Sequence, residues 1–139
     1  RFPTDCIPSL LTYSQPPTGE AKDVAIGGFL KQAVERLRPK GVAIAVDVFG
    51  LVTTEHDMGI GQRLETIGKY ADYVSPMVYP PTWASGAFNI DYPPAEPYRV
   101  VNESIKRAVE RLANTGAVVR PWLQAFDDYR SGRMGAITR

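Results

Sequence analysis

The sequence predicts an α/β fold with parallel strands, on the strength of two observations. After residue 20, segments with a helical apolar period alternate with short apolar runs, which is the pattern of βα units that feed a parallel sheet. The apolar runs have no in–out alternation, as expected of strands that are covered on both faces. Three units cannot close a barrel. A chain of 139 residues is therefore either a small open sheet or three of the eight units of a (β/α)₈ barrel, which needs about 250 residues.

Three segments have the apolar spacing of amphipathic helices. The first is 23–38, where apolar residues recur at three- and four-residue steps until Pro39 and Gly41 end the helix. The second is a shorter helix over 60–70. The third, over 97–113, has the most regular apolar stripe in the chain. Each helix precedes one of the apolar runs.

The apolar runs predict three strands, over 42–48, 72–79 and 117–124. Two of them contain a proline, Pro76 in the second and Pro121 in the third. Proline removes a hydrogen-bond donor from the ladder and usually argues against a central strand. Both prolines lie within a few residues of the C-terminal end of their strand, where pairing is already ending, and we therefore retain the strands.

Composition and charge indicate a globular chain and exclude several classes of function. Apolar residues make up 44% and charged residues 22% of the chain, which are ordinary globular values. The net charge of +1 argues against binding to nucleic acid or to an anionic membrane surface, and no apolar run reaches the length of a membrane span. The single cysteine, Cys6, and single histidine, His56, exclude an internal disulfide and a metal site with several such ligands. We expect no metal and no other cofactor.

Polar and aromatic side chains stand near the C-terminal end of each predicted strand. Asp47 lies near the end of the first strand and Tyr79 ends the second, while the third is followed or ended by Trp122, Gln124 and Asp127. In parallel α/β folds the active site lies at the carboxyl ends of the strands. All of these residue types can hold or act on a polyhydroxylated ligand, so we expect them to form the site.

Asp47 is the candidate catalytic residue. A carboxylate inside an apolar strand is costly to bury unless it is paired, and enzymes use positioned carboxyl groups for acid–base catalysis. The structural alternative is that Asp47 accepts hydrogen bonds from loop amides or pairs with an arginine on a neighbouring strand. Its position at a strand end favours the catalytic role.

The loop over 80–97 is long for a compact domain, and such loops are usually functional or disordered. It contains five prolines, which stiffen the backbone, and the aromatic residues Trp83, Phe88 and Tyr92. Aromatic faces stack well on the apolar faces of sugar rings. We expect Trp83 to contact a ligand, although these aromatics could instead pack the loop onto the domain.

His56 stands between Glu55 and Asp57 in the loop after the first strand. A histidine beside two acids suggests proton transfer or metal binding, but no second histidine is present to complete a metal site. A solvated loop is the alternative. We include His56 among the candidate substrate-binding residues.

Several motifs resemble, in the same order, those of a bacterial family of glycoside-hydrolase-like proteins with a (β/α)₈ barrel, which is distantly similar to the α-amylase and α-galactosidase clans. The resemblance covers nearly the whole chain. The motifs that carry it are Arg1-Phe2-Pro3, Ala45-Val46-Asp47-Val48-Phe49-Gly50, Asp57-Met58-Gly59-Ile60-Gly61-Gln62, Asp72-Tyr73-Val74-Ser75-Pro76-Met77-Val78-Tyr79-Pro80 and Arg120-Pro121-Trp122-Leu123-Gln124.

The resemblance implies that the three strands are strands five to seven of the barrel. Arg1 would then continue the end of strand four, and the family's nucleophile would lie upstream of residue 1. Residues 1–139 would form one partial domain, truncated at both ends and inactive alone. Asp47 would be the acid/base residue within the chain. Relatives carry an acid directly after Trp-Leu-Gln, whereas this chain has Ala125 there. The resemblance therefore supports a site role for Asp127 less strongly than for Asp47.

The resemblance also implies a function, which is hydrolysis of a glycosidic bond by two carboxylates in the intact protein. The alternative is a non-catalytic carbohydrate-binding module or a degenerate barrel. A carbohydrate is the expected partner, and the open edges of a partial sheet could support self-association. Secretion or attachment to the cell envelope follows from the family resemblance alone.

Overall fold

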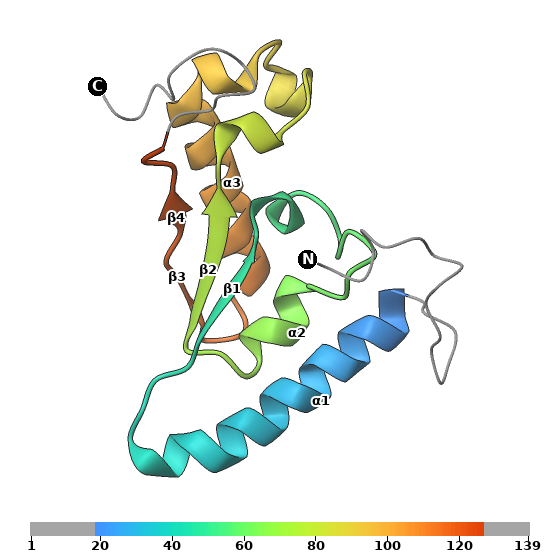
Figure 1. The fold of residues 1–139 in the computed structure, drawn as a ribbon, viewed down its shortest axis with the longest axis vertical. Coiled ribbons are helices and arrows are strands. Elements are labelled where there is room, and N and C mark those ends of the chain that lie inside the picture. Colours follow the sequence, from blue (N-terminus) through green and yellow to red (C-terminus); the bar gives the residue numbers. More distant parts are fainter. Residues whose placement is uncertain (1–18, 127–139) are drawn as a thin grey trace.

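The computed structural model describes residues 19–126 of the chain. Helices and strands alternate along this part of the chain (Figure 1). Short 3₁₀ turns occupy parts of the connections between them. The regular elements are α1 (Gly19–Leu37), β1 (Ala45–Phe49), α2 (Leu64–Gly68), β2 (Tyr73–Val78), α3 (Pro97–Leu112), β3 (Val118–Val119) and β4 (Trp122–Leu123).

β2 is the central strand of an open parallel sheet. β1 pairs with one edge of β2, and β3 and β4 follow one another along the opposite edge. All three pairings are parallel. The predicted α/β class with parallel strands is therefore confirmed. That this sheet is part of a closed barrel stays a prediction.

The third predicted strand, over 117–124, is divided into β3 and β4. The break contains Arg120 and Pro121 and faces Ser75 and Pro76 of β2, since β3 pairs with Tyr73–Val74 and β4 with Met77–Val78. Neither proline has an N–H to contribute to the ladder. The ladder stops where the two prolines meet across the strands, and it resumes once both have been passed.

The second helix is much shorter than the predicted segment 60–70. Positive φ angles occur at Met58 (55°), Gly59 (67°) and Gly61 (80°). Residues in this left-handed conformation cannot take part in a right-handed helix. The chain therefore turns through 58–61, and α2 begins only at Leu64.

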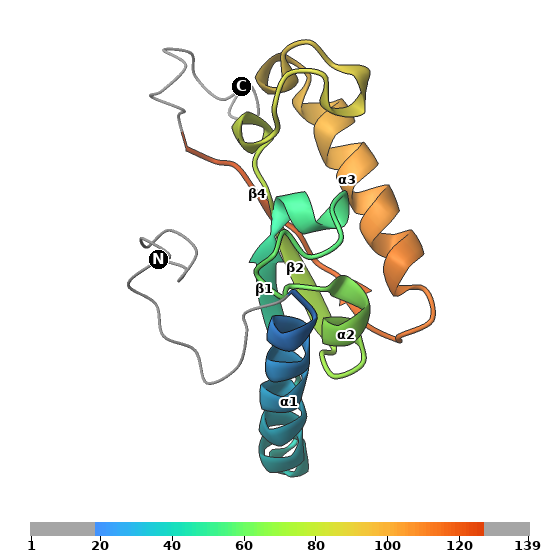
Figure 2. The same ribbon diagram turned by 90° about the vertical axis from the view of Figure 1, so that its right-hand side faces the viewer.

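The helices pack against one face of the sheet (Figure 2). Val48 of β1 and Val74 of β2 point to this face, where both are fully buried. They pack in one core cluster with Leu30 of α1, Leu64 of α2 and Leu112 of α3. Alternate strand residues point to the opposite face, which no helix within residues 19–126 covers.

Arg111 of α3 fixes the loop that follows β1. Its guanidinium group donates hydrogen bonds to both carboxylate oxygens of Glu65 in α2, at 2.7 and 2.9 Å. It also donates to the backbone oxygens of Val52, Glu55 and His56. The hydrogen bond from Arg111 is the main reason why the pKa of Glu65 is lowered from 4.5. One side chain thus joins α2, α3 and the loop.

No helix in the described part of the chain is long and apolar enough to cross a membrane.

Candidate functional site

The open face of the sheet gathers side chains from all of its strands. Asp47 of β1 is in register with Ser75 of β2, and Trp122 of β4 is in register with Met77 of β2. Paired residues of parallel strands point to the same face, and so do residues two positions apart. Asp47, Ser75 and Trp122 therefore share the face that carries no helix.

Asp47 and Trp122 are in direct contact. The indole Nε1 of Trp122 donates a hydrogen bond of 3.0 Å to Oδ1 of Asp47. The contact passes across β2 and joins residues 75 positions apart in sequence. Trp122 remains 53% exposed, so about half of the residue's surface is accessible to a ligand. The pair combines a fixed carboxylate with an exposed aromatic surface.

Ser75 is a feature of this face that sequence reasoning missed. Its side chain is only 1% exposed, and its Oγ has no hydrogen-bond partner among the described residues. Its register with Asp47 places it between β1 and the break in the opposite strand. The sequence feature that could have identified Ser75 is its position as a polar residue within the apolar run of β2.

Arg120 lies on the same face, nearer the N-terminal ends of the strands. In the structure its guanidinium carbon lies 5.0 Å from the centre of the Tyr73 ring. This cation–π contact places Arg120 over β2, and no ion pair between Arg120 and a described acid accompanies it.

Tyr79 and Gln124 follow β2 and β4 and organise the segment after the sheet. The ring of Tyr79 packs edge-on against that of Phe126, with 5.2 Å between the ring centres. Gln124 is buried, and its Nε2 donates a hydrogen bond of 2.8 Å to the backbone oxygen of Phe126. The amide of Gln124 is therefore engaged with the backbone, whereas Tyr79 is only half-buried.

Trp83 lies on the other side of the sheet from Asp47. It is 5% exposed and packs in a second core cluster with Val78, Ile90 and Val100 of α3. Gly50 allows this packing, because a Cβ there would lie 2.2 Å from the backbone oxygen of Met77 and 2.8 Å from the Trp83 ring. The structure thus does not bring Trp83 into the group formed by Asp47 and Trp122.

His56 and Asp127 complete the set of predicted site residues. His56 is exposed, and its Nδ1 lies 3.8 Å from a carboxylate oxygen of Asp57. Its backbone is held by Arg111, on the helix side of the sheet. Asp127 lies outside the described residues. Within residues 19–126, no three acidic, histidine or cysteine side chains cluster in a way that could hold a metal ion.

The structure places Asp47 in the middle of β1 and not near the strand end that the sequence predicted, because β1 runs from Ala45 to Phe49. Comparison of the sequence with known families is a separate source of evidence. A family model described as "Putative glycosyl hydrolase domain" matches residues 1–137. The chain belongs to this family. No curated protein and no solved structure matches the chain. The family match confirms the predicted glycoside hydrolase family, and it makes a carbohydrate the expected class of substrate.

Proposed function

We propose that the full-length protein hydrolyses glycosidic bonds on the open face of this sheet, with Asp47 as one of the two catalytic carboxylates. The observation that carries the proposal is the hydrogen bond from Trp122 to Asp47. Asp47 is the one acidic residue within the described strands. The family match independently points to this chemistry.

In this proposal the two carboxylate oxygens of Asp47 have different roles. The indole N–H is a donor only, so it fixes Oδ1 as an acceptor and sets the orientation of the group. Oδ2 is then the atom that exchanges a proton with the glycosidic oxygen. When the bond breaks, the leaving oxygen takes this proton and water supplies the hydroxyl group to the anomeric carbon. The remaining proton of that water passes to the carboxylate that acts as the base.

Trp122 serves a second purpose in this proposal. Its exposed ring lies beside the carboxylate that it orients. A sugar ring stacked on this surface would have its glycosidic oxygen close to Asp47. Tyr79, which is half-buried at the end of β2, adds a further aromatic surface along the same face.

Glycoside hydrolysis usually needs a second carboxylate, about 5–5.5 Å away for retention or about 6.5–9.5 Å for inversion of the anomeric configuration. Within residues 19–126, the strands offer no second acid on this face. We propose that the partner carboxylate is supplied by residues outside this range.

The experiment is the release of reducing ends from a panel of polysaccharides by the full-length protein and by Asp47→Asn. Loss of one acid–base group lowers the rate by about 10²- to 10⁴-fold. Glu35→Gln is the matched control, because Glu35 is an exposed acid of α1 for which no contact is described. We expect Glu35→Gln to keep full activity.

Two results would contradict the proposal. Undiminished turnover by Asp47→Asn would remove Asp47 from the mechanism. Binding of a polysaccharide without turnover by the wild type would instead favour a carbohydrate-binding module, for which the exposed Trp122 ring would be sufficient.

A further inference from the structure

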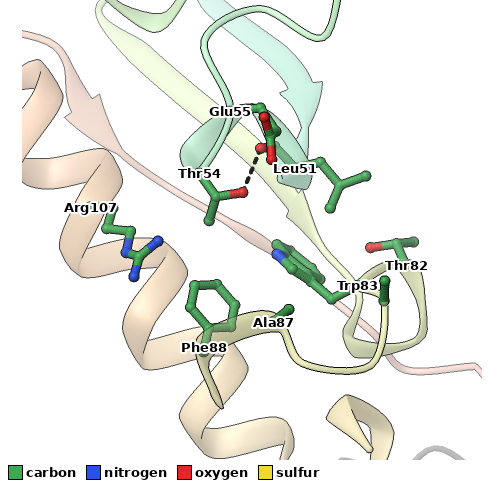
Figure 3. A pocket seen from close by; sticks show the side chains of 9 residues that line it. Leu51, Thr54, Glu55, Thr82, Trp83, Ala87, Phe88 and Arg107 are labelled. Carbon is green, nitrogen blue, oxygen red and sulfur yellow. Dashed lines mark hydrogen bonds between the residues drawn. The ribbon is translucent and has the colours of Figure 1, made fainter. Parts of the chain in front are cut away.

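A cavity lies on the helix side of the sheet, apart from the face that carries Asp47. Its volume is about 380 Å³, which is within the usual range for small-molecule sites. It is bounded by the loop after β1, the segment after β2 and one face of α3 (Figure 3). Its lining includes Leu51, Thr54, Glu55, Trp83, Phe88 and Arg107.

The indole N–H of Trp83 is the first indication that this cavity binds a ligand. Trp83 is 5% exposed, and its buried Nε1 has no hydrogen-bond partner among the described residues. Figure 3 shows the indole directed into the space between Thr54 and Phe88. A buried donor without an acceptor is unfavourable. An oxygen atom of a bound molecule would satisfy it.

Arg107 is the second, independent indication. Its guanidinium carbon lies 4.9 Å from the centre of the Phe88 ring, and this contact holds the charge at the rim of the cavity (Figure 3). The ion pairs formed between described residues use other arginines. Arg107 is exposed and forms no ion pair with a described acid, whereas the buried indole N–H of Trp83 has no acceptor among the described residues. An anionic oxygen in the cavity suits both groups.

Glu55 lines another part of the cavity wall and is a hydrogen-bond acceptor, whereas Trp83 and Arg107 are donors. Arg111 engages the backbone oxygen of Glu55 but pairs its charge with Glu65. The carboxylate of Glu55 is free of an ion pair with a described residue and is the acceptor that this part of the wall offers to hydroxyl groups. The remaining wall, which includes Leu51 and Phe88, is apolar and suits the C–H face of a ring.

We propose that this cavity binds a single sugar unit that carries a carboxylate, a hexuronate. Its carboxylate accepts hydrogen bonds from Arg107 and from the indole of Trp83. Its hydroxyl groups donate to Glu55, and its apolar face packs against Phe88. A neutral sugar leaves Arg107 unpaired, and an anion without hydroxyl groups leaves Glu55 without donors. The site is separate from Asp47 and does not depend on catalysis there.

The experiment uses the indole N–H signals in a ¹⁵N–¹H correlation spectrum. The chain has two tryptophans, Trp83 and Trp122, one on each side of the sheet, and Trp83→Phe and Trp122→Phe assign their signals. The chain is titrated with glucuronate, glucose and acetate. We expect glucuronate to shift the Trp83 signal saturably and to leave the Trp122 signal in place, with glucose and acetate binding about tenfold more weakly or worse.

Arg107→Gln and Lys106→Gln form the matched pair of variants. Lys106 is the adjacent exposed cation on α3 and is not part of the cavity wall. Arg107→Gln should weaken glucuronate binding by about tenfold, and Lys106→Gln should leave it unchanged. Circular dichroism reports whether each variant is folded.

Three outcomes would overturn the proposal. Failure of glucuronate to shift the Trp83 signal would show that the cavity does not bind a hexuronate. Equal shifts with glucose would contradict recognition of the carboxylate. A shift of the Trp122 signal alone would place the sugar on the Asp47 face, which would support the proposed hydrolase site and contradict this one.

Discussion

Arg111 of α3 and Glu65 of α2 form a two-pronged ion pair between residues 46 positions apart, and the same guanidinium group also holds the loop after β1. No β-strand takes part in this contact. It connects the helical layer to a loop that leads away from the sheet, so it stabilises the end of the molecule where the cavity lies.

Arg111→Met should lower the free energy of unfolding by about 1–3 kcal/mol, because it leaves the carboxylate and several backbone oxygens without their donor. Urea denaturation followed by circular dichroism measures the change. Lys106→Met, on the same helix but exposed and without a described contact, should change the free energy of unfolding by less than about 0.5 kcal/mol. Equal effects of the two variants would show that the Arg111 contacts contribute nothing specific.

The pKa of Glu65 predicts a pH dependence of stability. Because the folded-state pKa lies below 4.5, the unfolded state binds more protons than the folded state between the two pKa values. The contribution of Glu65 is therefore fully present above pH 4.5 and is lost as the pH falls through the folded-state pKa. Unfolding midpoints in urea between neutral and acidic pH should decline less steeply for Glu65→Gln than for the wild type. Parallel curves would contradict the prediction.

Gly50→Ala should destabilise the fold by about 1–3 kcal/mol. The new methyl group would collide with the backbone oxygen of Met77 and the ring of Trp83. Gly28→Ala is the control, since Gly28 lies in α1 and a methyl group added there would meet no atom within 4 Å, and alanine is the better helix former. Thermal unfolding should rank Gly50→Ala below the wild type and Gly28→Ala level with it or above.

Trp122→Phe should separate positioning of Asp47 from folding. Phenylalanine keeps an aromatic surface but cannot donate the hydrogen bond to Asp47. Since Trp122 is largely exposed, the free energy of unfolding should change by less than about 0.5 kcal/mol. If the proposed function is correct, kcat should fall by about tenfold with little change in KM. A rise in KM with unchanged kcat would show that Trp122 binds sugar without orienting the carboxylate.

The α/β class follows from the sequence because it depends on local patterns, which are the helical apolar period of 97–113 and the continuous apolar run of 42–48. The division of the third strand does not, because it requires Pro76 and Pro121 to meet across two strands. That Asp47 and Trp122 lie on the same face of the sheet follows from strand alternation once the register is known. The position of Trp83 could not be predicted in this way, because the segment after β2 has no regular period that would assign its side chains to one face or the other.

Because β4 is only two residues long, the contact between Trp122 and Asp47 should be short-lived. β4 meets β2 at only two register positions, and Pro121 separates it from β3. Short, weakly attached segments open locally at a much lower free energy than the whole domain. The amide of Leu123 should therefore exchange with deuterium faster than that of Val74. The indole would leave and rejoin the carboxylate as β4 opens and closes, so the fraction of molecules with an aligned Asp47 is set by this local equilibrium and not by global unfolding.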